Sequence, residues 1–354
     1  MALDRKSPRV HGERPLIGIT MGDPSGIGPE VIAKGLAGAA IRRMCRPLVI
    51  GSPEVLAETI RSLGLPLTVR VVRDHEGYVE RRRDIAVLDP LPRPIGRFRM
   101  GVASAKTGNA SVEYITKAVR LAELGCIDAM VTAPINKKAI NLAGHAYPGH
   151  TELLADLTQS KAVGMMILGG PLKIMFVTTH LSLRNLPDAL TRARIEQSIR
   201  LADVAMRELF RVPRPRIGVA ALNPHAGESG LFGDEEKRTI LPAARRARAA
   251  GIRNSDPLPA DTLFGKAARG DFDAVVAMYH DQGLIPLKLV AFGRCVNLTV
   301  GIPIIRTSVD HGTAYDIAGK GVADPGSLIE AVSLATTLAL SKRRKASVLR
   351  LARA

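Results

Sequence analysis

The fold is decided by a stretch near the start of the chain, PLIGITMGDPSGIGPE at residues 15–30. Its first half is apolar throughout and does not alternate with polar residues, as expected for a strand buried on both faces of a mainly parallel sheet. Its second half carries Gly22, Gly26 and Gly28, which permit tight turns and close backbone approach. Pro29 then suits the first position of a helix. The stretch therefore predicts a strand, a turn and a helix in direct succession.

The same succession continues along the chain, because apolar runs of strand length and amphipathic helical patterns follow one another. The clearest strands are expected at residues 47–51, 129–133, 173–179, 216–222 and 274–278. The clearest helices are expected at residues 111–124, 192–209, 235–250 and 327–341. Repeated strand–helix order favours an α/β fold with a mainly parallel sheet.

The length of 354 residues exceeds one ordinary core, since single cores stop growing near roughly 250–300 residues. No Pro- or Gly-rich linker divides the chain, so we expect two interleaved α/β/α domains that share a cleft. We place the first at residues 15–136 plus 295–346 and the second at residues 137–294. Residues 1–14 and 347–354 are expected to be tails.

Cysteine usage and hydropathy indicate the compartment. Cys45, Cys126 and Cys295 lie far apart without C-x-x-C spacing, which favours reduced thiols. No stretch reaches the roughly 18 apolar residues of a membrane span. Residues 1–14 have no apolar segment typical of a signal peptide. We therefore expect a cytoplasmic protein without a membrane span.

The formal net charge of +17 suggests a nucleic-acid-binding protein at first sight. Much of the charge is local, since residues 342–354 hold six basic residues and no acid. Aromatic residues, which stack on bases in many nucleic-acid-binding proteins, make up only 3% of the chain. We therefore expect no nucleic-acid partner, and a basic surface that attracts anionic ligands.

Three of the eight histidines, His180, His225 and His280, follow predicted strands directly. Ligands of open α/β sheets bind beyond the carboxyl ends of the strands. Imidazole is the commonest protein ligand for zinc and similar divalent ions, and three neutral ligands leave positions open for a substrate. The pattern is compatible with a metal site and with ordinary histidines at strand ends.

Other polar residues also follow apolar runs. His150 and Thr151 offer hydrogen-bond donors for a carboxylate or phosphate. Arg306 follows the run IPII, expected to be another strand, and its guanidinium suits bidentate anion binding. The stretch DHGTAYDIAGKG at residues 310–321 supplies small residues and backbone amides on a loop. A solvated surface with a buried ion pair is the alternative interpretation.

Several motifs together resemble the 4-hydroxythreonine-4-phosphate dehydrogenase family of pyridoxal phosphate synthesis, over about residues 16–332. They are GDPSGIGPE at 22–30, GHTE at 149–152, NPHAGE at 223–228, MYHDQG at 278–283 and RTSVDHGT at 306–313. The last motif is also similar to the cofactor loop of isocitrate and isopropylmalate dehydrogenases, whose fold the resemblance implies.

The resemblance implies metal-dependent oxidative decarboxylation of a 4-phosphorylated hydroxy acid, with NAD or NADP as cofactor. It implies a homodimer that shares a divalent ion, such as zinc, cobalt or magnesium, across its interface. His180, His225 and His280 would hold the ion, with His280 reaching across from the other subunit. The first domain would then be the cofactor side, and the second would carry the metal, the substrate and the dimer interface.

The resemblance also assigns roles to other residues, position by position. The implied substrate-binding residues are His150, Thr151, Lys288, Asn297 and Arg306. The implied cofactor-binding residues are Asp310, Gly312, Thr313 and Asp316. Lys288 and Asp261 are the candidates for the catalytic proton relay.

One segment departs from the family pattern. Biosynthetic members have the sequence GPVHK where this chain has APINK, so Asn136 stands in place of a histidine. Residues 143–154 resemble a second branch, the dehydrogenases of D-threonate or D-erythronate 4-phosphate. Two other classes stay open as alternatives, a phosphate acyltransferase-like enzyme on a related fold and a basic nucleic-acid-binding protein.

Overall fold

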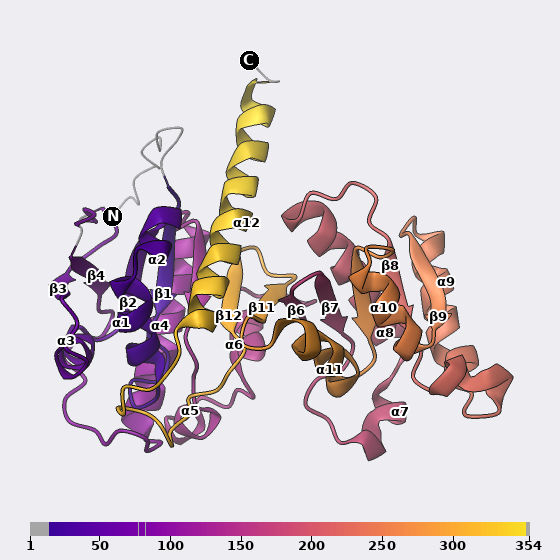
Figure 1. The fold of residues 1–354 in the computed structure, drawn as a ribbon, viewed down its shortest axis with the longest axis horizontal. Coiled ribbons are helices and arrows are strands. Elements are labelled where there is room, and N and C mark those ends of the chain that lie inside the picture. Colours follow the sequence, from indigo (N-terminus) through magenta and orange to yellow (C-terminus); the bar gives the residue numbers. More distant parts are fainter. Residues whose placement is uncertain (1–13, 77, 82, 352–354) are drawn as a thin grey trace. The chain divides into compact units, whose positions relative to one another are not determined.

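The computed structural model describes residues 14–351 except residues 77 and 82, and it consists of two compact units. Unit 1 contains the chain up to Gln159 and again from Pro303, and unit 2 is the continuous segment Ser160–Ile302 (Figure 1). The prediction of two interleaved α/β units is therefore confirmed. In the part of the chain that is described, no helix combines the length and apolarity needed to cross a membrane.

Unit 1 is built on a parallel sheet with the strand order β3-β4-β2-β1-β5-β12. Every residue of β1 and β5 is buried, as the continuous apolar runs predict for strands covered on both faces. The strands are β1 (Leu16–Thr20), β2 (Arg46–Ile50), β3 (Thr68–Val71), β4 (Asp84–Leu88), β5 (Ala129–Thr132) and β12 (Arg306–Val309).

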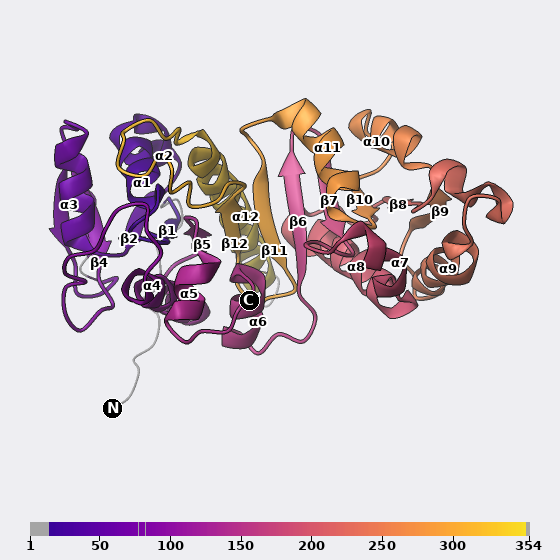
Figure 2. The same cartoon turned by 90° about the horizontal axis from the view of Figure 1, so that it is seen from below.

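Helices cover both faces of the unit 1 sheet (Figure 2). One face carries α1 (Gly28–Ala37), α2 (Ala39–Met44), α3 (Pro53–Ser62) and α12 (Gly326–Leu351). The other carries α4 (Ala105–Glu123), α5 (Lys137–Leu142) and α6 (His150–Leu157). The predicted order of strand, turn and helix at residues 15–30 is confirmed, with Pro29 in the first turn of α1.

Unit 2 has a mixed sheet with the order β11-β6-β7-β10-β8-β9. Strands β7, β10, β8 and β9 run parallel, whereas β6 is antiparallel to both β7 and β11. The strands are β6 (Gly164–Gly169), β7 (Leu172–Phe176), β8 (Ile217–Ala220), β9 (Asn254–Leu258), β10 (Ala274–Ala277) and β11 (Val296–Val300).

Helices α10 (Ala260–Ala268) and α11 (His280–Ala291) cover one face of the unit 2 sheet, and α8 (Arg192–Val204) and α9 (Leu241–Ala249) cover the other (Figure 2). The core between the sheet and α10–α11 includes Ile174, Phe176, Leu263, Leu284 and Leu287. Shorter pieces are the 3-10 segments Leu183–Asn185 and Pro224–Gly230, the helix α7 (Leu186–Ala189), and the π-helical turns Ala205–Leu209 and Glu236–Ile240.

One local prediction was wrong. Arg306 does not follow a strand but begins β12, because Gly301 has a positive φ of 94° and Pro303 follows it, so the apolar run before Arg306 bends. Residues 347–351 of the predicted C-terminal tail are the last residues of α12, which ends at Leu351. Residues 1–13 and 352–354 of the predicted tails lie outside the described residues.

The chain passes from unit 1 to unit 2 after Gln159 and returns to unit 1 at Pro303. The sequence had predicted these two boundaries after residues 136 and 294. The first difference arises because α5 and α6 both pack against α4 of unit 1. A Cβ atom on Gly108 of α4 would lie 2.0 Å from the carbonyl oxygen of Ala139 in α5, so the two helices meet backbone to backbone. This contact keeps the segment after β5 in unit 1.

Replacing Gly108 by alanine tests that contact. The new methyl group would force α4 and α5 apart, and we expect the free energy of unfolding to fall by about 1–3 kcal/mol in urea titrations. Gly265→Ala in α10 is the matched control, because its Cβ atom would meet only the Arg269 guanidinium at 3.7 Å. There we expect a gain of about 0.5–1 kcal/mol from helix propensity. Equal effects of the two changes would contradict the close approach.

Candidate functional site

The turn after β1 is hydrogen-bonded to two other loops of unit 1. The N–H of Asp23 donates to the carbonyl of Pro134 at 2.8 Å, and the N–H of Ile27 donates to the carbonyl of Thr313 at 3.0 Å. Gly22 has φ +69°, and a Cβ atom there would lie 2.3 Å from the Pro134 oxygen. The predicted close backbone approach of this glycine is therefore confirmed. The loops after β5 and β12 are fixed against the same turn.

A buried cation lies beside the carboxyl end of β5. Arg306 is 1% exposed, and its Nε and Nη2 atoms donate to the hydroxyl of Thr132 at 3.2 and 2.6 Å. His150, the first residue of α6, lies close enough for its imidazole to interact electrostatically with Arg306. The His150 Nε2 atom is buried and has no hydrogen-bond partner among the described residues. These three residues form what we call the anion pocket.

Burial shifts the protonation of both basic groups in the anion pocket. It lowers the pKa of Arg306 to about 9, which leaves the guanidinium charged at neutral pH. Burial, together with repulsion by Arg306, lowers the pKa of His150 well below its usual range. The pocket therefore offers one positive charge and one neutral imidazole, a combination suited to an anion that also needs a hydrogen-bond partner.

The predicted cofactor loop follows β12. The N–H of Asp310 donates to the Ser327 hydroxyl at 3.2 Å, and Thr313 is buried. Gly312 and Asp316 are exposed, so they are accessible to a ligand. The structure thus places the four predicted cofactor residues on one short segment of unit 1.

In unit 2, two of the three predicted metal ligands lie together. The ring centroids of His180 and His280 are 5.7 Å apart, and His280 is the first residue of α11. The Nδ1 atom of His280 donates to the Asp281 carboxylate at 2.6 Å, since a carboxylate can only accept. A histidine held in this way keeps its Nε2 atom for a metal ion. The structure places His280 beside His180 of its own chain, whereas the resemblance implied that it reaches across.

His225 lies apart in an unusual segment after β8. Residues 225–229 all have positive φ, from 41° to 80°, which is strained for residues other than glycine. The Glu236 carboxylate holds the segment by accepting the N–H groups of Leu222 and Asn223, each at 2.8 Å. The Nδ1 atom of His225 is 3.4 Å from the Glu228 carboxylate. The segment is a shaped loop that presents an exposed imidazole.

All three histidines have the chemistry of ligands for a divalent ion, but only two of them lie together. Within the described ranges, no three His, Cys, Asp or Glu side chains are grouped so as to hold a metal ion. His180 and His280 supply two imidazole ligands, and a structural or catalytic site requires at least three protein ligands. A metal ion held by this pair would therefore need a third ligand from elsewhere.

The remaining predicted residues lie in both units. Thr151 is half-buried and follows His150 in the first turn of α6. Lys288 is half-buried, about two turns along α11 from His280. Asn297 lies on β11, and its Oδ1 atom is buried without a hydrogen-bond partner in the described structure. Asp261 is exposed in the first turn of α10.

Sequence reasoning missed three residues that the structure ties to these loops. Thr132 contacts Arg306, Tyr315 contacts Asp23, and Lys34 contacts the loop at Gly321. Each contact joins residues more than 170 positions apart, so local spacing carries no signal for it. Glu30 and Lys34 lie one helical turn apart, a spacing at which opposite charges can pair.

The chain resembles known proteins over most of its length. The family model described as "Pyridoxal phosphate biosynthetic protein PdxA" matches residues 43–335. The chain is 51% identical over 325 residues to a 4-hydroxythreonine-4-phosphate dehydrogenase of Desulfosudis oleivorans, covering 91% of this chain and 95% of that protein. It is 48% identical over 333 residues to a D-threonate 4-phosphate dehydrogenase of Cupriavidus necator, with coverages of 92% and 97%.

A crystal structure described as 4-hydroxythreonine-4-phosphate dehydrogenase from Klebsiella pneumoniae matches with a TM-score of 0.84 and 46% identity. The match covers 92% of this chain and 99% of that one. These relatives are dehydrogenases, which supports that class over an acyltransferase or a nucleic-acid-binding protein.

The low pKa of His150 predicts a pH dependence of stability. A histidine in an unfolded chain has a pKa of about 6.5. Below that pH the unfolded chain therefore binds a proton at His150 that the folded chain does not. We expect the free energy of unfolding to fall between about pH 7.5 and 5.5, and His150→Gln to make this decrease smaller. Urea titrations across this range measure the slope. His145→Gln removes a histidine of the same unit as a control, and an unchanged slope in His150→Gln would contradict the assignment.

Proposed function

The chain belongs to the family of the pyridoxal phosphate biosynthetic protein PdxA, and on this premise we propose that it is a cytoplasmic NAD(P)- and metal-dependent dehydrogenase of a 4-phosphorylated hydroxy acid. The first candidate substrate is 4-hydroxythreonine 4-phosphate, which is named for a relative with 51% identity. The observation that carries the proposal is the anion pocket. A guanidinium that is 1% exposed and contacts a neutral hydroxyl is suited to receive a phosphate or carboxylate.

Each residue of the anion pocket would make a different contact with the substrate. Arg306 would donate to two oxygens of the anion, because its fork of N–H groups matches carboxylate and phosphate geometry. His150 would add a hydrogen bond through its unpartnered Nε2 atom. Thr151, Lys288 and Asn297 are proposed as further substrate contacts. Fixing a substrate at both ends sets its hydroxyl in a defined position for reaction.

When bound, the nicotinamide dinucleotide supplies a hydride acceptor and the divalent ion supplies Lewis acidity during oxidation and decarboxylation. His180 and His280 would hold the ion, with His225 as the third ligand, and the Asp281 carboxylate would fix the His280 ring. Zinc, cobalt and magnesium remain the candidate ions, and imidazole ligands favour the first two.

Other residues would hold the cofactor and move protons. Asp310, Gly312, Thr313 and Asp316 are the proposed dinucleotide contacts. Lys288 is half-buried and lies on the same helix as His280, which suits it to exchange a proton with the substrate. Asp261 is the second candidate for this relay, although its exposed carboxylate makes it the more easily solvated of the two.

D-Threonate or D-erythronate 4-phosphate is the second candidate substrate, and Asn136 is the reason. Asn136 caps α5, because its Oδ1 atom accepts the N–H of Ala139 at 3.0 Å. Asparagine is among the best N-cap residues, so its presence here has a structural cause as well. The chain is 48% identical to a D-threonate 4-phosphate dehydrogenase, so both substrates need to be compared directly.

We further propose that the protein is a homodimer. Ile285, Leu289 and Phe292 lie on one side of α11 and its C-cap, and they are 61%, 82% and 82% exposed. Large apolar side chains clustered in this way mark an interaction surface. The same helix begins at His280, so a second copy bound here would lie next to the histidine pair. That copy could then supply the missing metal ligand.

A substrate panel tests the function. We expect NADH or NADPH to form from one of the 4-phosphates of 4-hydroxythreonine, D-threonate and D-erythronate, and a chelator to abolish the reaction. Turnover of 4-hydroxythreonine 4-phosphate would support the first candidate, and turnover of either sugar acid would support the second. No turnover of any of the three would overturn the proposal.

The anion pocket provides the matched variants for that panel. We expect Arg306→Gln to raise KM for the phosphorylated acid about 100-fold or more, because it removes a buried charge-assisted contact. Arg216→Gln removes an arginine that is paired with Asp273 in unit 2, and it should leave KM unchanged. Equal KM values for the two variants would remove Arg306 from the binding site.

The dimer is tested on α11. We expect Leu289→Asp to shift the protein to a monomer in analytical ultracentrifugation, because a buried unpaired carboxylate costs several kcal/mol at an interface. Metal content measured by atomic emission should fall with the dimer. Val71→Asp, at an exposed apolar position on β3, is the control. A monomeric unaltered protein, or a dimeric Leu289→Asp, would contradict this surface.

A further inference from the structure

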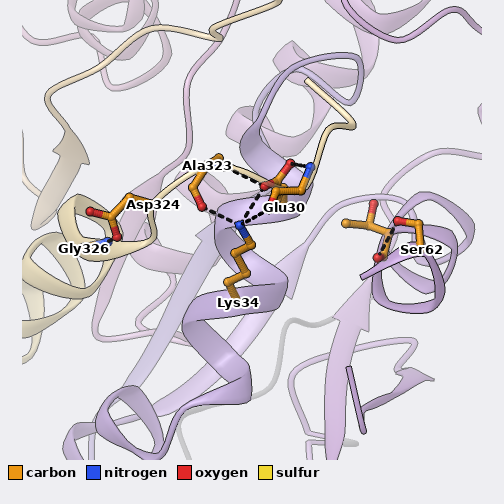
Figure 3. Close-up of polar contacts among 8 residues, drawn as sticks. Glu30, Lys34, Ser62, Ala323, Asp324 and Gly326 are labelled. Atoms are coloured by element: carbon orange, nitrogen blue, oxygen red, sulfur yellow. Dashed lines mark hydrogen bonds and ion pairs between the residues drawn. The ribbon is translucent and has the colours of Figure 1, made fainter. Parts of the chain in front are cut away.

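An ion pair on α1 fastens the far end of the cofactor loop. Lys34 Nζ lies 2.9 Å from Glu30 Oε1 one helical turn away, and Glu30 is only 3% exposed. The Glu30 carboxylate also accepts the N–H groups of Gly321 at 3.2 Å and Ala323 at 2.7 Å. Lys34 in turn donates to the carbonyls of the same two residues, at 2.9 and 2.7 Å. Figure 3 shows the ammonium group of Lys34 among these acceptors.

This set of hydrogen bonds is complete on the lysine side. An ammonium group has three protons, and Lys34 has three acceptors, one charged and two on the backbone. A nearly buried carboxylate is stable only when it is paired and hydrogen-bonded. Glu30 meets both conditions through Lys34 and the loop backbone. The loop at residues 321–323 is therefore part of the environment that allows Glu30 to be buried.

A second fastening lies at the near end of the loop. The Tyr315 hydroxyl donates to Asp23 Oδ2 at 2.6 Å, and Asp23 is fully buried. The other carboxylate oxygen accepts the N–H and the hydroxyl of Ser25, at 2.9 and 2.7 Å. The carboxylate is thereby fixed in one orientation. The hydrogen bond from Ile27 to the Thr313 carbonyl lies beside it.

The backbone is strained beside the near fastening and open between the two. Ala314 has φ +42°, a conformation that costs a non-glycine residue about 1–3 kcal/mol unless its surroundings impose it. Between the two fastenings, Asp316, Gly319 and Lys320 are exposed. The segment thus keeps polar groups accessible while both of its ends are fixed.

We propose that Asp23, Glu30, Lys34 and Tyr315 form a loop clamp that holds residues 313–323 in the conformation that binds the nicotinamide dinucleotide. The inference rests on the proposed function, because it takes this loop as the cofactor site. The four side chains are positioning residues, since they contact the loop and not the ligand. If the binding conformation is populated only in part, the apparent affinity falls by the same fraction. Loosening the clamp therefore weakens dinucleotide binding without altering the anion pocket.

Tyr315→Phe tests the clamp with a small change, since it removes one hydroxyl and keeps the ring. We expect the Kd for NADH or NADPH, measured by fluorescence on the full chain without substrate, to rise about tenfold. Amide hydrogen exchange should quicken within residues 313–323. KM for the phosphorylated acid should stay unchanged, and so should the melting temperature of the ligand-free protein within a few degrees.

Two further variants separate the clamp from general destabilisation. Tyr147→Phe removes another tyrosine–carboxylate hydrogen bond, 2.5 Å to Asp156, away from the loop, and should bind dinucleotide normally. Lys34→Met should weaken binding in the same direction as Tyr315→Phe, whereas Lys266→Met removes an exposed lysine and should not.

The outcomes are distinct. Unchanged dinucleotide affinity in Tyr315→Phe overturns the inference alone, as does a parallel loss of melting temperature and of affinity for the phosphorylated acid. Absence of saturable NADH and NADPH binding by the unaltered chain overturns the proposed function, and the inference with it. A selective rise in the dinucleotide Kd that both controls lack supports the clamp.

Discussion

Three backbone hydrogen bonds join the loops at the carboxyl ends of the strands in unit 1. The turn after β1 donates from Asp23 to the loop after β5 and from Ile27 to the loop after β12, and it accepts from Gly101 in the loop after β4 through Ser25. Buried backbone groups have to be paired, so none of these loops can move without leaving a donor or acceptor unsatisfied. The loops after β4, β5 and β12 are therefore all fixed to this one turn. The region proposed to bind ligands thereby obtains rigidity from the backbone as well as from side chains.

Strands that are apolar over most of their length were predictable from sequence, whereas β12, which opens with a buried arginine, was not. β1 and β5 are continuous apolar runs, whereas β12 opens with an arginine that the sequence placed after the strand. A buried charge at the start of a strand is rare, so hydropathy gives no signal for it. The contacts of Thr132, Lys34 and Tyr315 join segments distant in sequence, and only the folded chain shows them. The family resemblance named the proposed binding residues but not the residues that contact their loops.

The histidines are a second case in which the sequence predicted only part of the arrangement. Their spacing in the sequence put all three after strands, which is where the structure has them. It could not show that His180 and His280 lie together while His225 stands on a left-handed segment held by Glu236. That arrangement depends on local backbone geometry and on a carboxylate eleven residues away from the histidine. If the three histidines hold an ion as proposed, ion binding would depend on the position of a separate loop.

The interleaving of the two units bears on how the chain is made. Unit 2 is continuous from Ser160 to Ile302, so a ribosome releases all of it before the last strand and helix of unit 1 emerge. Until then β5 lacks its neighbour β12, and one edge of the unit 1 sheet exposes unpaired backbone and apolar side chains. Unit 1 therefore stays incomplete while unit 2 is synthesised. The anion pocket, which needs Arg306, can form only after all of unit 2 has been synthesised.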